Sequence, residues 1–478
     1  MSSTTELIDL QADNDNPHPS PSPNSKSNFT ANTNTNTTDQ TDQTTLHSYT
    51  YDIETKEPVE EDQIHHTHTH THTDAGPPDG GFAAWSVVLG AWCALFCSFG
   101  WTNSIGTFQT YYETTLLSGY SASTIAWIPS LEVFFMFLMG PIVGTLSDTL
   151  GPRSVLVGGT FLHVFGLMMT SISTQYYQVL LSQGVCSAMG LCAIFQPSMS
   201  AIPSWFDQRR GTAYGIVATG SSLGGIVFPI MVDRLIKEVG FAWAMRVAAF
   251  LILFLLVFSC MFVRARVAPL KLQHQMDREV LVRPFREVKM WLLILGFVFL
   301  TFGVYIPIDY LEMAAMSQGM SAAMAQYLVP VLNAGSFFGR MLAGVFSDKV
   351  GAYNIFISVG TFTGILVLAV WVPATSNAGS IVFSVLFGFS SGAYFSLAVA
   401  LVAGIAPPRE IGYWTGVLFL FASVGGLTTN PIGGAILQHD DGSYTGMKIY
   451  SGVLLIAGSL FVMGTRIRQT GWVLKKKF

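Results

Sequence analysis

Arg340 and Glu132 are charged side chains that stand alone in long apolar stretches of the sequence. Between Met324 and Phe346, Arg340 is the only charged residue. A planar guanidinium can bind a carboxylate through two parallel hydrogen bonds. Inside a bilayer an unpaired arginine costs roughly 3 kcal/mol or more, so it needs a partner or a water-filled cavity. We expect Arg340 to face a cavity; the alternative is that it extends to the membrane edge near Asp348.

Other side chains could complete a binding site around Arg340. Asn333 and either Ser336 or Phe337 share a helical face with Arg340. Four aromatic residues lie in runs expected near the centre of the molecule: Phe99, Tyr305, Tyr394 and Trp414. Aromatic side chains suit a flat organic ligand, and they suit helix packing equally well.

Glu132 lies about one turn inside its apolar run, in the stretch WIPSLEVFFMFLMG. A carboxyl group at such a place is a candidate proton carrier. The alternative is a carboxyl held by hydrogen bonds near the outer surface, and the two are evenly matched. His163, in a neighbouring run, is more typical of a helix–helix contact than of a proton relay.

The composition indicates a membrane protein. Of 478 residues, 50% are hydrophobic and 11% charged, with a mean hydropathy of +0.46, whereas soluble proteins carry about 25% charged residues. The apolar residues form runs of about 20, the length that a helix needs to cross a bilayer. We predict twelve transmembrane helices, near 84–108, 124–147, 154–173, 178–203, 212–236, 242–263, 290–313, 323–346, 353–373, 379–404, 412–436 and 447–466.

Basic residues are distributed unevenly between alternate loops. Loops after even-numbered runs, with the C-terminal tail, hold Arg153, Arg209, Arg210, Arg264, Arg266, Lys271, Arg278, Arg283, Arg286, Lys289, Lys349, Arg409, Arg466, Arg468 and Lys475 to Lys477. The opposite loops hold Arg234, Lys237 and Lys448. Because cytoplasmic loops carry the excess of Lys and Arg, we expect both termini in the cytoplasm.

The chain divides into two membrane halves and three polar segments. Residues 1–78 are too hydrophilic to fold and predict a disordered cytoplasmic tail, in which HHTHTHTHT is more typical of a solvated tract than of a metal site. Sequons at Asn28 and Asn36 should stay unglycosylated in a cytoplasmic tail. The other segments are a six-helix half at 79–263, a basic cytoplasmic linker at 264–289, a second six-helix half at 290–467, and a basic cytoplasmic tail at 468–478.

The two halves repeat each other. GTLSDTLG begins at Gly144 and GVFSDKVG at Gly344, an offset of 200 residues. GGIVFP begins at Gly224 and GGLTTNP at Gly425, an offset of 201 residues. A duplicated unit is typical of transporters that bind substrate between their repeats.

The stretch GTLSDTLGPR resembles the signature loop of the major facilitator superfamily, and this resemblance extends over all twelve runs. It implies an all-α membrane protein with the major facilitator fold, twelve transmembrane helices in two six-helix halves. It also implies that Asp148 and Arg153 belong to a latch between the halves on the cytoplasmic side. The second copy keeps Asp348 but has Ala352 and Tyr353 where a basic residue would help, so we expect a weaker latch there.

A finer resemblance lies in PDGGFAAW, from Pro78, and WFDQRRGTAYGIVATGSSLGG, from Trp205. Together they look like the paired signatures of the monocarboxylate porter family, in particular its fungal branch. Asp79 could cap the helix that follows it. Arg209 and Arg210 are either anchors at the membrane surface or part of a gate.

In the porter family an arginine of the eighth helix pairs with a substrate carboxylate, and Arg340 matches that position. Two departures qualify the resemblance. Ser336 stands where animal members have an aspartate, and Asn103 stands where they have a lysine that helps to carry the proton. Lactate transport by that mechanism is therefore in doubt.

These observations predict a secondary transporter of a small organic molecule, in a fungal plasma membrane, that works by alternating access. Export of a fungal metabolite is slightly favoured over uptake of a monocarboxylate or vitamin-like nutrient, with protons as a candidate co-substrate. A non-transporting nutrient sensor is a third reading. The sequence lacks a phosphate-binding loop and a nucleophile–base–acid set, so we expect no nucleotide, nucleic acid, metal or other cofactor and no enzyme activity.

Overall fold

The computed structural model describes residues 76–266 and 277–473. Within these ranges the regular structure is helical, and twelve helical spans are long and apolar enough to cross a membrane. The predicted all-α fold with twelve transmembrane helices is confirmed. The sequons at Asn28 and Asn36 and the histidine tract at 65–73 lie outside the described residues.

The first six spans contain several short helical pieces. They are α1 (Phe82–Cys97), α2 (Phe99–Thr102), α3 (Ile105–Tyr111), η1 (Tyr112–Leu116), α4 (Ala122–Ile125), α5 (Trp127–Leu138), α6 (Gly140–Leu150), α7 (Pro152–Ile172), α8 (Tyr176–Val179), η2 (Leu180–Ser187), α9 (Ala188–Ala201), η3 (Ile202–Ser204), α10 (Arg210–Val239) and α11 (Phe241–Phe262). η1 and η2 are π-helical, and η3 is a 3₁₀ turn.

The second group of spans follows a short linker helix, α13 (Arg278–Arg286). Its elements are α14 (Val288–Ser317), α15 (Ala322–Ala325), α16 (Leu328–Val350), α17 (Ala352–Leu366), the π-helical η4 (Val367–Trp371), α18 (Asn377–Ala403), α19 (Ile411–His439) and α20 (Thr445–Thr470). All of α13 thus falls inside the segment that the sequence predicts as a linker, 264–289, and the first two residues of α14 do as well.

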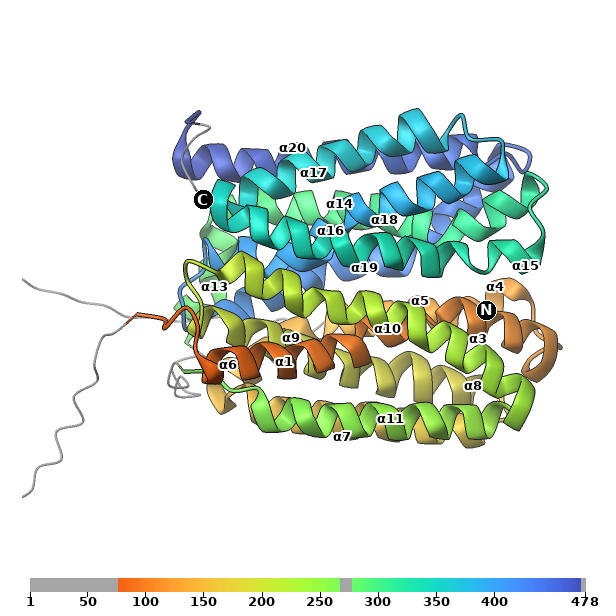
Figure 1. Cartoon of the computed structure of the whole chain (residues 1–478), viewed down its shortest axis with the longest axis horizontal. Coiled ribbons are helices and arrows are strands. Elements are labelled where there is room, and N and C mark those ends of the chain that lie inside the picture. The colour runs from red at the N-terminus through yellow and green to blue at the C-terminus, as the bar shows by residue number, and fades with distance from the viewer. Residues whose placement is uncertain (1–75, 267–276, 474–478) are drawn as a thin grey trace, which may run out of the picture. The chain divides into compact units, whose positions relative to one another are not determined.

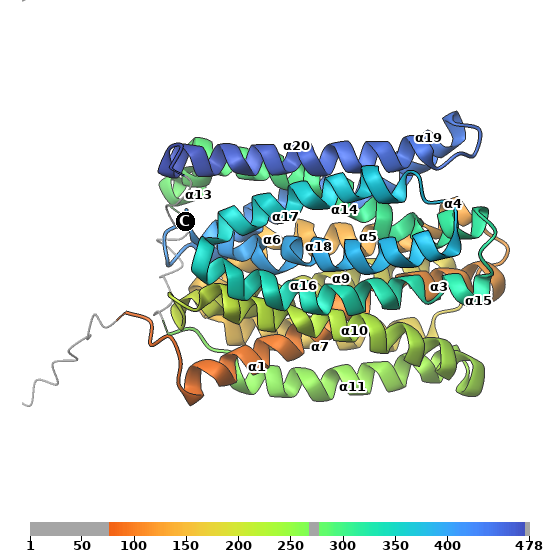
Figure 2. The same ribbon diagram turned by 45° about the horizontal axis from the view of Figure 1, so that its top comes forward.

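The spans run side by side, with the earlier ones on one side and the later ones on the other (Figures 1 and 2). The two groups meet where α10 packs against α16 and where α5 and α6 pack against α19. We call the end that holds α13 and the starts of α10 and α19 the linker end. The opposite end, which holds α3, α4 and α15, is the far end (Figure 1).

The first span is interrupted, whereas the sequence predicts one helix over 84–108. The backbone departs from helical geometry at Ser98, and the chain turns again at Asn103 and Ser104. Ser98 Oγ donates to the Ala94 carbonyl and Asn103 Nδ2 to the Phe99 carbonyl, so side chains satisfy backbone groups near both breaks. Irregular backbone is tolerated in a bilayer where it is buried in protein or lines a cavity.

Candidate functional site

Asp148, near the end of α6, joins the first half to the second. Its two carboxylate oxygens accept hydrogen bonds from the backbone N–H groups of Gly412 (3.1 Å) and Tyr413 (2.8 Å), which begin α19. The first N–H groups of a helix have no partner within the helix, and the helix dipole favours negative charge there. Asp148 therefore holds the N-terminus of a helix that belongs to the opposite half.

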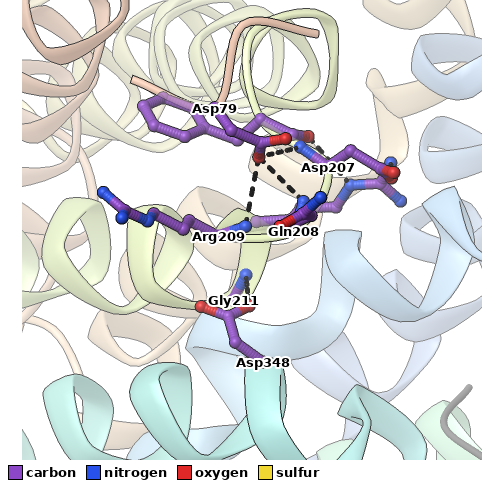
Figure 3. A network of polar contacts seen from close by, with 8 residues as sticks. Asp79, Asp207, Gln208, Arg209, Gly211 and Asp348 are labelled. Carbon is purple, nitrogen blue, oxygen red and sulfur yellow. Dashed lines mark hydrogen bonds and ion pairs between the residues drawn. The ribbon is translucent and has the colours of Figure 1, made fainter. Parts of the chain in front are cut away.

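Asp348, near the end of α16, makes the equivalent contact in the other direction. At the start of α10, its carboxylate accepts a hydrogen bond from Gly211 N (2.6 Å) (Figure 3). It also accepts hydrogen bonds from Thr212 N (2.8 Å) and Thr212 Oγ1 (2.5 Å). The expectation of a weaker second latch therefore finds no support in these contacts. Helix-terminal amides donate hydrogen bonds to both aspartates.

Arg153 lies outside the latch to which the resemblance assigned it. Its side chain is exposed in the first turn of α7, and the hydrogen bonds described for Asp148 come from α19. The sequence signature thus locates the aspartate correctly, while its partners come from a distant part of the chain.

Asp79 binds the turn that directly precedes α10. Its Oδ1 accepts hydrogen bonds from the backbone N–H groups of Asp207 (2.7 Å), Gln208 (2.8 Å) and Arg209 (3.2 Å) (Figure 3). Asp79, Gly80 and Gly81 all have positive φ, which gives the turn its sharp curvature. The expectation that Asp79 caps its own helix is wrong, because α1 has no side-chain cap.

Arg209 and Arg210 lie in this turn. The Arg210 guanidinium pairs with Asp207 (2.9 Å) and donates to the Phe206 carbonyl (3.3 Å), while the Arg209 side chain is exposed. Arg210 therefore stabilises the turn that presents its N–H groups to Asp79.

The start of α19 has a comparable second contact, provided by α13. Arg283 forms a 2.7 Å ion pair with Glu410, whose side chain is buried, and the Tyr413 hydroxyl donates to the Leu281 carbonyl (2.9 Å). Trp414, expected near the central cavity, instead donates to Glu410 (3.1 Å) at the linker end. We call the Asp79 contact and the α13 contact the two clasps.

Glycines allow the helices behind the latches to approach closely. A side-chain carbon at Gly140 would lie 2.7 Å from the Gly416 carbonyl oxygen, and one at Gly215 would lie 2.8 Å from the Arg340 carbonyl oxygen. Both distances are well inside van der Waals contact, so only glycine fits. Gln196 adds a bridge by donating to the Gly140 (3.0 Å) and Gly412 (2.9 Å) carbonyls.

Arg340 lies deep in the interface between α16 and α10, with 5% of its surface exposed. Its guanidinium donates to Ser336 Oγ (2.9 Å), to the Ala218 carbonyl (3.0 Å) and to Ser221 Oγ. Ala218 and Ser221 are roughly 12 and 16 Å from the start of α10, at 1.5 Å per residue. The alternative of an arginine that extends to the membrane edge is therefore wrong for this conformation.

The partners described for Arg340 are neutral. The hydrogen bonds go to hydroxyl and carbonyl oxygens, and the guanidinium also stacks 5.1 Å from the Phe395 ring. Among the ion pairs of the described residues, none includes Arg340. Within the part of the chain that the structure describes, the charge is thus solvated by hydroxyl and carbonyl groups of the protein.

A small aromatic pocket adjoins Arg340 through Phe395. Its rings come from both halves and are contributed by Phe99, Phe137, Phe195, Tyr394, Phe395 and Phe419. Phe99 and Tyr394, both predicted near a ligand, are therefore brought together here. Tyr305 is buried in α14 and lies outside the lining of this pocket.

Asn103 and Asn333 meet on the far-end side of Arg340. Asn333 Nδ2 donates to Asn103 Oδ1 at 3.3 Å, which links the break in the first span to α16. Asn333 is two helical turns from Arg340 on α16, about 10 Å. This hydrogen bond is a polar contact between the two halves on the far-end side of Arg340.

Comparison with known proteins identifies the family. The sequence matches the family model for the Major Facilitator Superfamily over residues 90–387 and 310–473. The chain belongs to the Major Facilitator Superfamily. Relatives in this superfamily include the MFS transporter asaE of Aspergillus flavus, 59% identical over 84% of this chain and 91% of the relative. Another is the fujikurins efflux protein of Gibberella fujikuroi, 51% identical over 85% of this chain and 87% of the relative.

The fold of this superfamily member also resembles solved structures. The transporter FucP in its outward conformation aligns with a TM-score of 0.63, at 14% sequence identity, over 79% of this chain and 98% of FucP. At that identity the likeness concerns the fold alone.

Several polar residues that connect helices in this region were not among the site residues predicted from the sequence. Gln196, Ser221, Glu410 and Arg283 all bridge helices, yet serine and glutamine in apolar runs are also typical of ordinary helix packing. The one available signal was Glu410, an acidic residue directly before an apolar run.

Proposed function

We propose that this superfamily member exports a small organic anion across the plasma membrane of a fungal cell by alternating access. The observation that carries the proposal is Arg340, a buried guanidinium whose described partners are neutral, beside an aromatic pocket shared by the two halves. A carboxylate can replace these neutral acceptors with two charge-assisted hydrogen bonds. The aromatic rings would cover the apolar body of the same molecule.

The relatives support the outward direction. One is named for the efflux of fujikurins, and a closer one is named a transporter without a stated direction. The paired signatures at Asp79 and Trp205 support assignment to the monocarboxylate porter family, and the absence of its lysine and aspartate at Asn103 and Ser336 supports a substrate other than lactate.

The orientation in the membrane follows from charge. The linker end carries exposed arginines, Arg209 and Arg409 among them, so we assign it to the cytoplasm. The conformation described here is then closed toward the cytoplasm by Asp148 and Asp348. Outward movement against a gradient requires an energy source, which we propose is the proton gradient.

The first test compares the metabolites of cells and medium, by mass spectrometry, with and without the gene. A compound that accumulates inside the deletion strain and disappears from its medium is the expected result and names the exported anion. A compound that remains unconsumed in the medium would reverse the direction and make the protein an importer. Signalling that fails while all metabolites stay unchanged would indicate a sensor instead.

A further inference from the structure

Glu132 lies on α5 with its side chain fully buried. Its Oε2 accepts one hydrogen bond, from Gln183 Nε2 at 3.0 Å, and its Oε1 has no partner. The Tyr112 hydroxyl donates to Gln183 Oε1 at 2.6 Å. This bond fixes the amide of Gln183, with its oxygen toward Tyr112 and its nitrogen toward Glu132.

Among the residues that the structure describes, no basic side chain bonds to this carboxyl group. Within the described ranges, the titratable residues on α5's neighbours and on η1 are Tyr112 and Glu113 on η1, Cys186 on η2, Cys192 on α9, Asp148 on α6, and Tyr413 and His439 at the two ends of α19. His163, on α7, forms a hydrogen bond between its Nδ1 and Ser187 Oγ of η2 (2.8 Å). An ionised carboxylate with a single neutral donor would pay a desolvation cost of several kcal/mol, so these surroundings favour the neutral, protonated form of Glu132.

We propose that Glu132, oriented by Gln183 and Tyr112, is the proton-binding site through which a proton gradient drives transport. This inference rests on the proposed function for its role in the cycle. Loading converts a carboxylate and a hydronium ion into a carboxyl group and water, and unloading reverses this on the other side of the membrane. The site lies outside the aromatic pocket, so proton and substrate occupy different places.

The position of Glu132 connects it to the movement of the halves. The next residue, Val133, packs against Gly426 of α19, which belongs to the opposite half. Glu132 is also roughly 8 Å along α5 from its start at the far end. Rocking of α5 against α19 would therefore change the access of water to Glu132 at the same time as it changes the access of substrate to its pocket.

The π-helical segment η2 is the second structural element of this site. It supplies Gln183 and, one turn later, Ser187. π-Helical turns are frequent at functional sites, since the wider turn redirects side chains. Here it brings one polar side chain to Glu132 and another to His163 on adjacent faces.

The first test is infrared difference spectroscopy of the purified full-length protein in detergent during a pH titration. We expect a protonated-carboxyl band in the wild type that is absent in Glu132→Gln and is kept in the control Glu113→Gln. Tyr112→Phe should shift this band, because Gln183 loses the bond that orients it, whereas the neighbouring Tyr111→Phe should leave it unchanged. Equal spectra for the wild type and Glu132→Gln would overturn the proposal, and the Tyr112 pair tests it even if Glu132→Gln does not fold.

The second test measures the export of the compound identified above as a function of external pH. Export by the wild type should change by about tenfold per pH unit over the range where one proton binds, and export by Glu132→Gln should vary less than about twofold. Unchanged pH dependence in Glu132→Gln would reject the coupling role. The infrared band needs no substrate, so a failure to find any exported compound would count against the proposed function and leave the proton site standing.

Discussion

At the scale of single residues, Arg340 contacts both halves of the protein, and we propose that it also binds the substrate anion. Its bonds to Ala218 and Ser221 cross from one half to the other, and its described partners are uncharged. An anion bound there would compete for the same N–H groups. Substrate binding would then weaken a contact between the halves, which is how recognition could favour a change of conformation.

Replacement of Arg340 tests this role. We expect Arg340→Ala to reduce transport by roughly 30-fold or more, since a buried charged hydrogen-bond partner contributes about 2–5 kcal/mol. Arg340→Lys keeps the charge but loses the two-pronged geometry, so it should recover only part of the rate. The measurement is export per molecule of surface-expressed protein, from the metabolite comparison.

Arg246 provides the matched control for Arg340. It lies in α11, stacks 5.1 Å from the Trp243 ring and donates to Ser171, all within one half. Arg246→Ala should leave substrate affinity unchanged. If both alanine variants lower affinity equally, the anion-binding role of Arg340 is refuted.

Single residues were predictable where their type is rare in an apolar run. Arg340 and Glu132 attract attention in the sequence because charges in membrane helices are costly. Gln183 and Ser221 do not, because their side chains are common in membrane helices and their partners lie on other helices. Sequence spacing therefore identified the charged group of each site but not the neutral groups that orient it.

At the scale of elements, the starts of α10 and α19 are each held twice. An aspartate of the opposite half binds the first N–H groups of each helix, and a segment that precedes each half binds the adjoining turn. Asp79 does so for α10, and Arg283 of α13 does so for α19. The clasps fix the turns whose N–H groups the latches need.

Removal of a latch charge should loosen the linker end. Asp148→Asn and Asp348→Asn each lose about 1 kcal/mol of interaction with a helix N-terminus, which corresponds to a roughly fivefold shift of population. We expect faster labelling of Ala398→Cys, a position in the lining of the aromatic pocket, by a reagent applied from the linker end. Slower or equal labelling would contradict the latch.

Loss of the Asp79 clasp should also speed the labelling of Ala398→Cys from the linker end, by a similar factor. Asp79→Ala removes the acceptor of three backbone N–H groups, and loss of a cap costs about 0.5–2 kcal/mol. Labelling of Ala398→Cys from the linker end should therefore increase. Asp233→Ala is the control, because its exposed pair with Lys237 lies toward the other end of α10.

The elements were predicted well where length and composition decide them. Twelve apolar runs gave twelve spans, because the bilayer imposes that length on each helix. The breaks at Ser98 and Asn103 were not predicted, since side-chain bonds to the carbonyl four residues earlier also occur inside unbroken helices. Asp79 was predicted to cap the helix that follows it. Instead it accepts hydrogen bonds from a turn that lies far along the chain, which sequence spacing does not reveal.

At the scale of the whole molecule, the sequence repeat gives two equivalent contacts between the halves. The offset of 200 between Asp148 and Asp348 corresponds to two reciprocal contacts, in which each half binds a helix start of the other. Such reciprocity lets both contacts break together when the halves rock apart. A single-residue change in one latch is thus partly compensated by the other, and the double variant should open the linker end further than either single one.

The side of the membrane that the linker end faces determines which side the latches close and from which side Glu132 takes its proton. We predict that Arg409→Cys, at the linker end, is protected from a membrane-impermeant thiol reagent in intact cells, whereas Ser118→Cys, in the exposed far-end turn, is labelled. Permeabilised cells should label both, which controls for local reactivity. The reverse pattern would place Asp148 and Asp348 at the outer face, so that the conformation described here would be closed to the outside and Glu132 would take its proton from the cytoplasm.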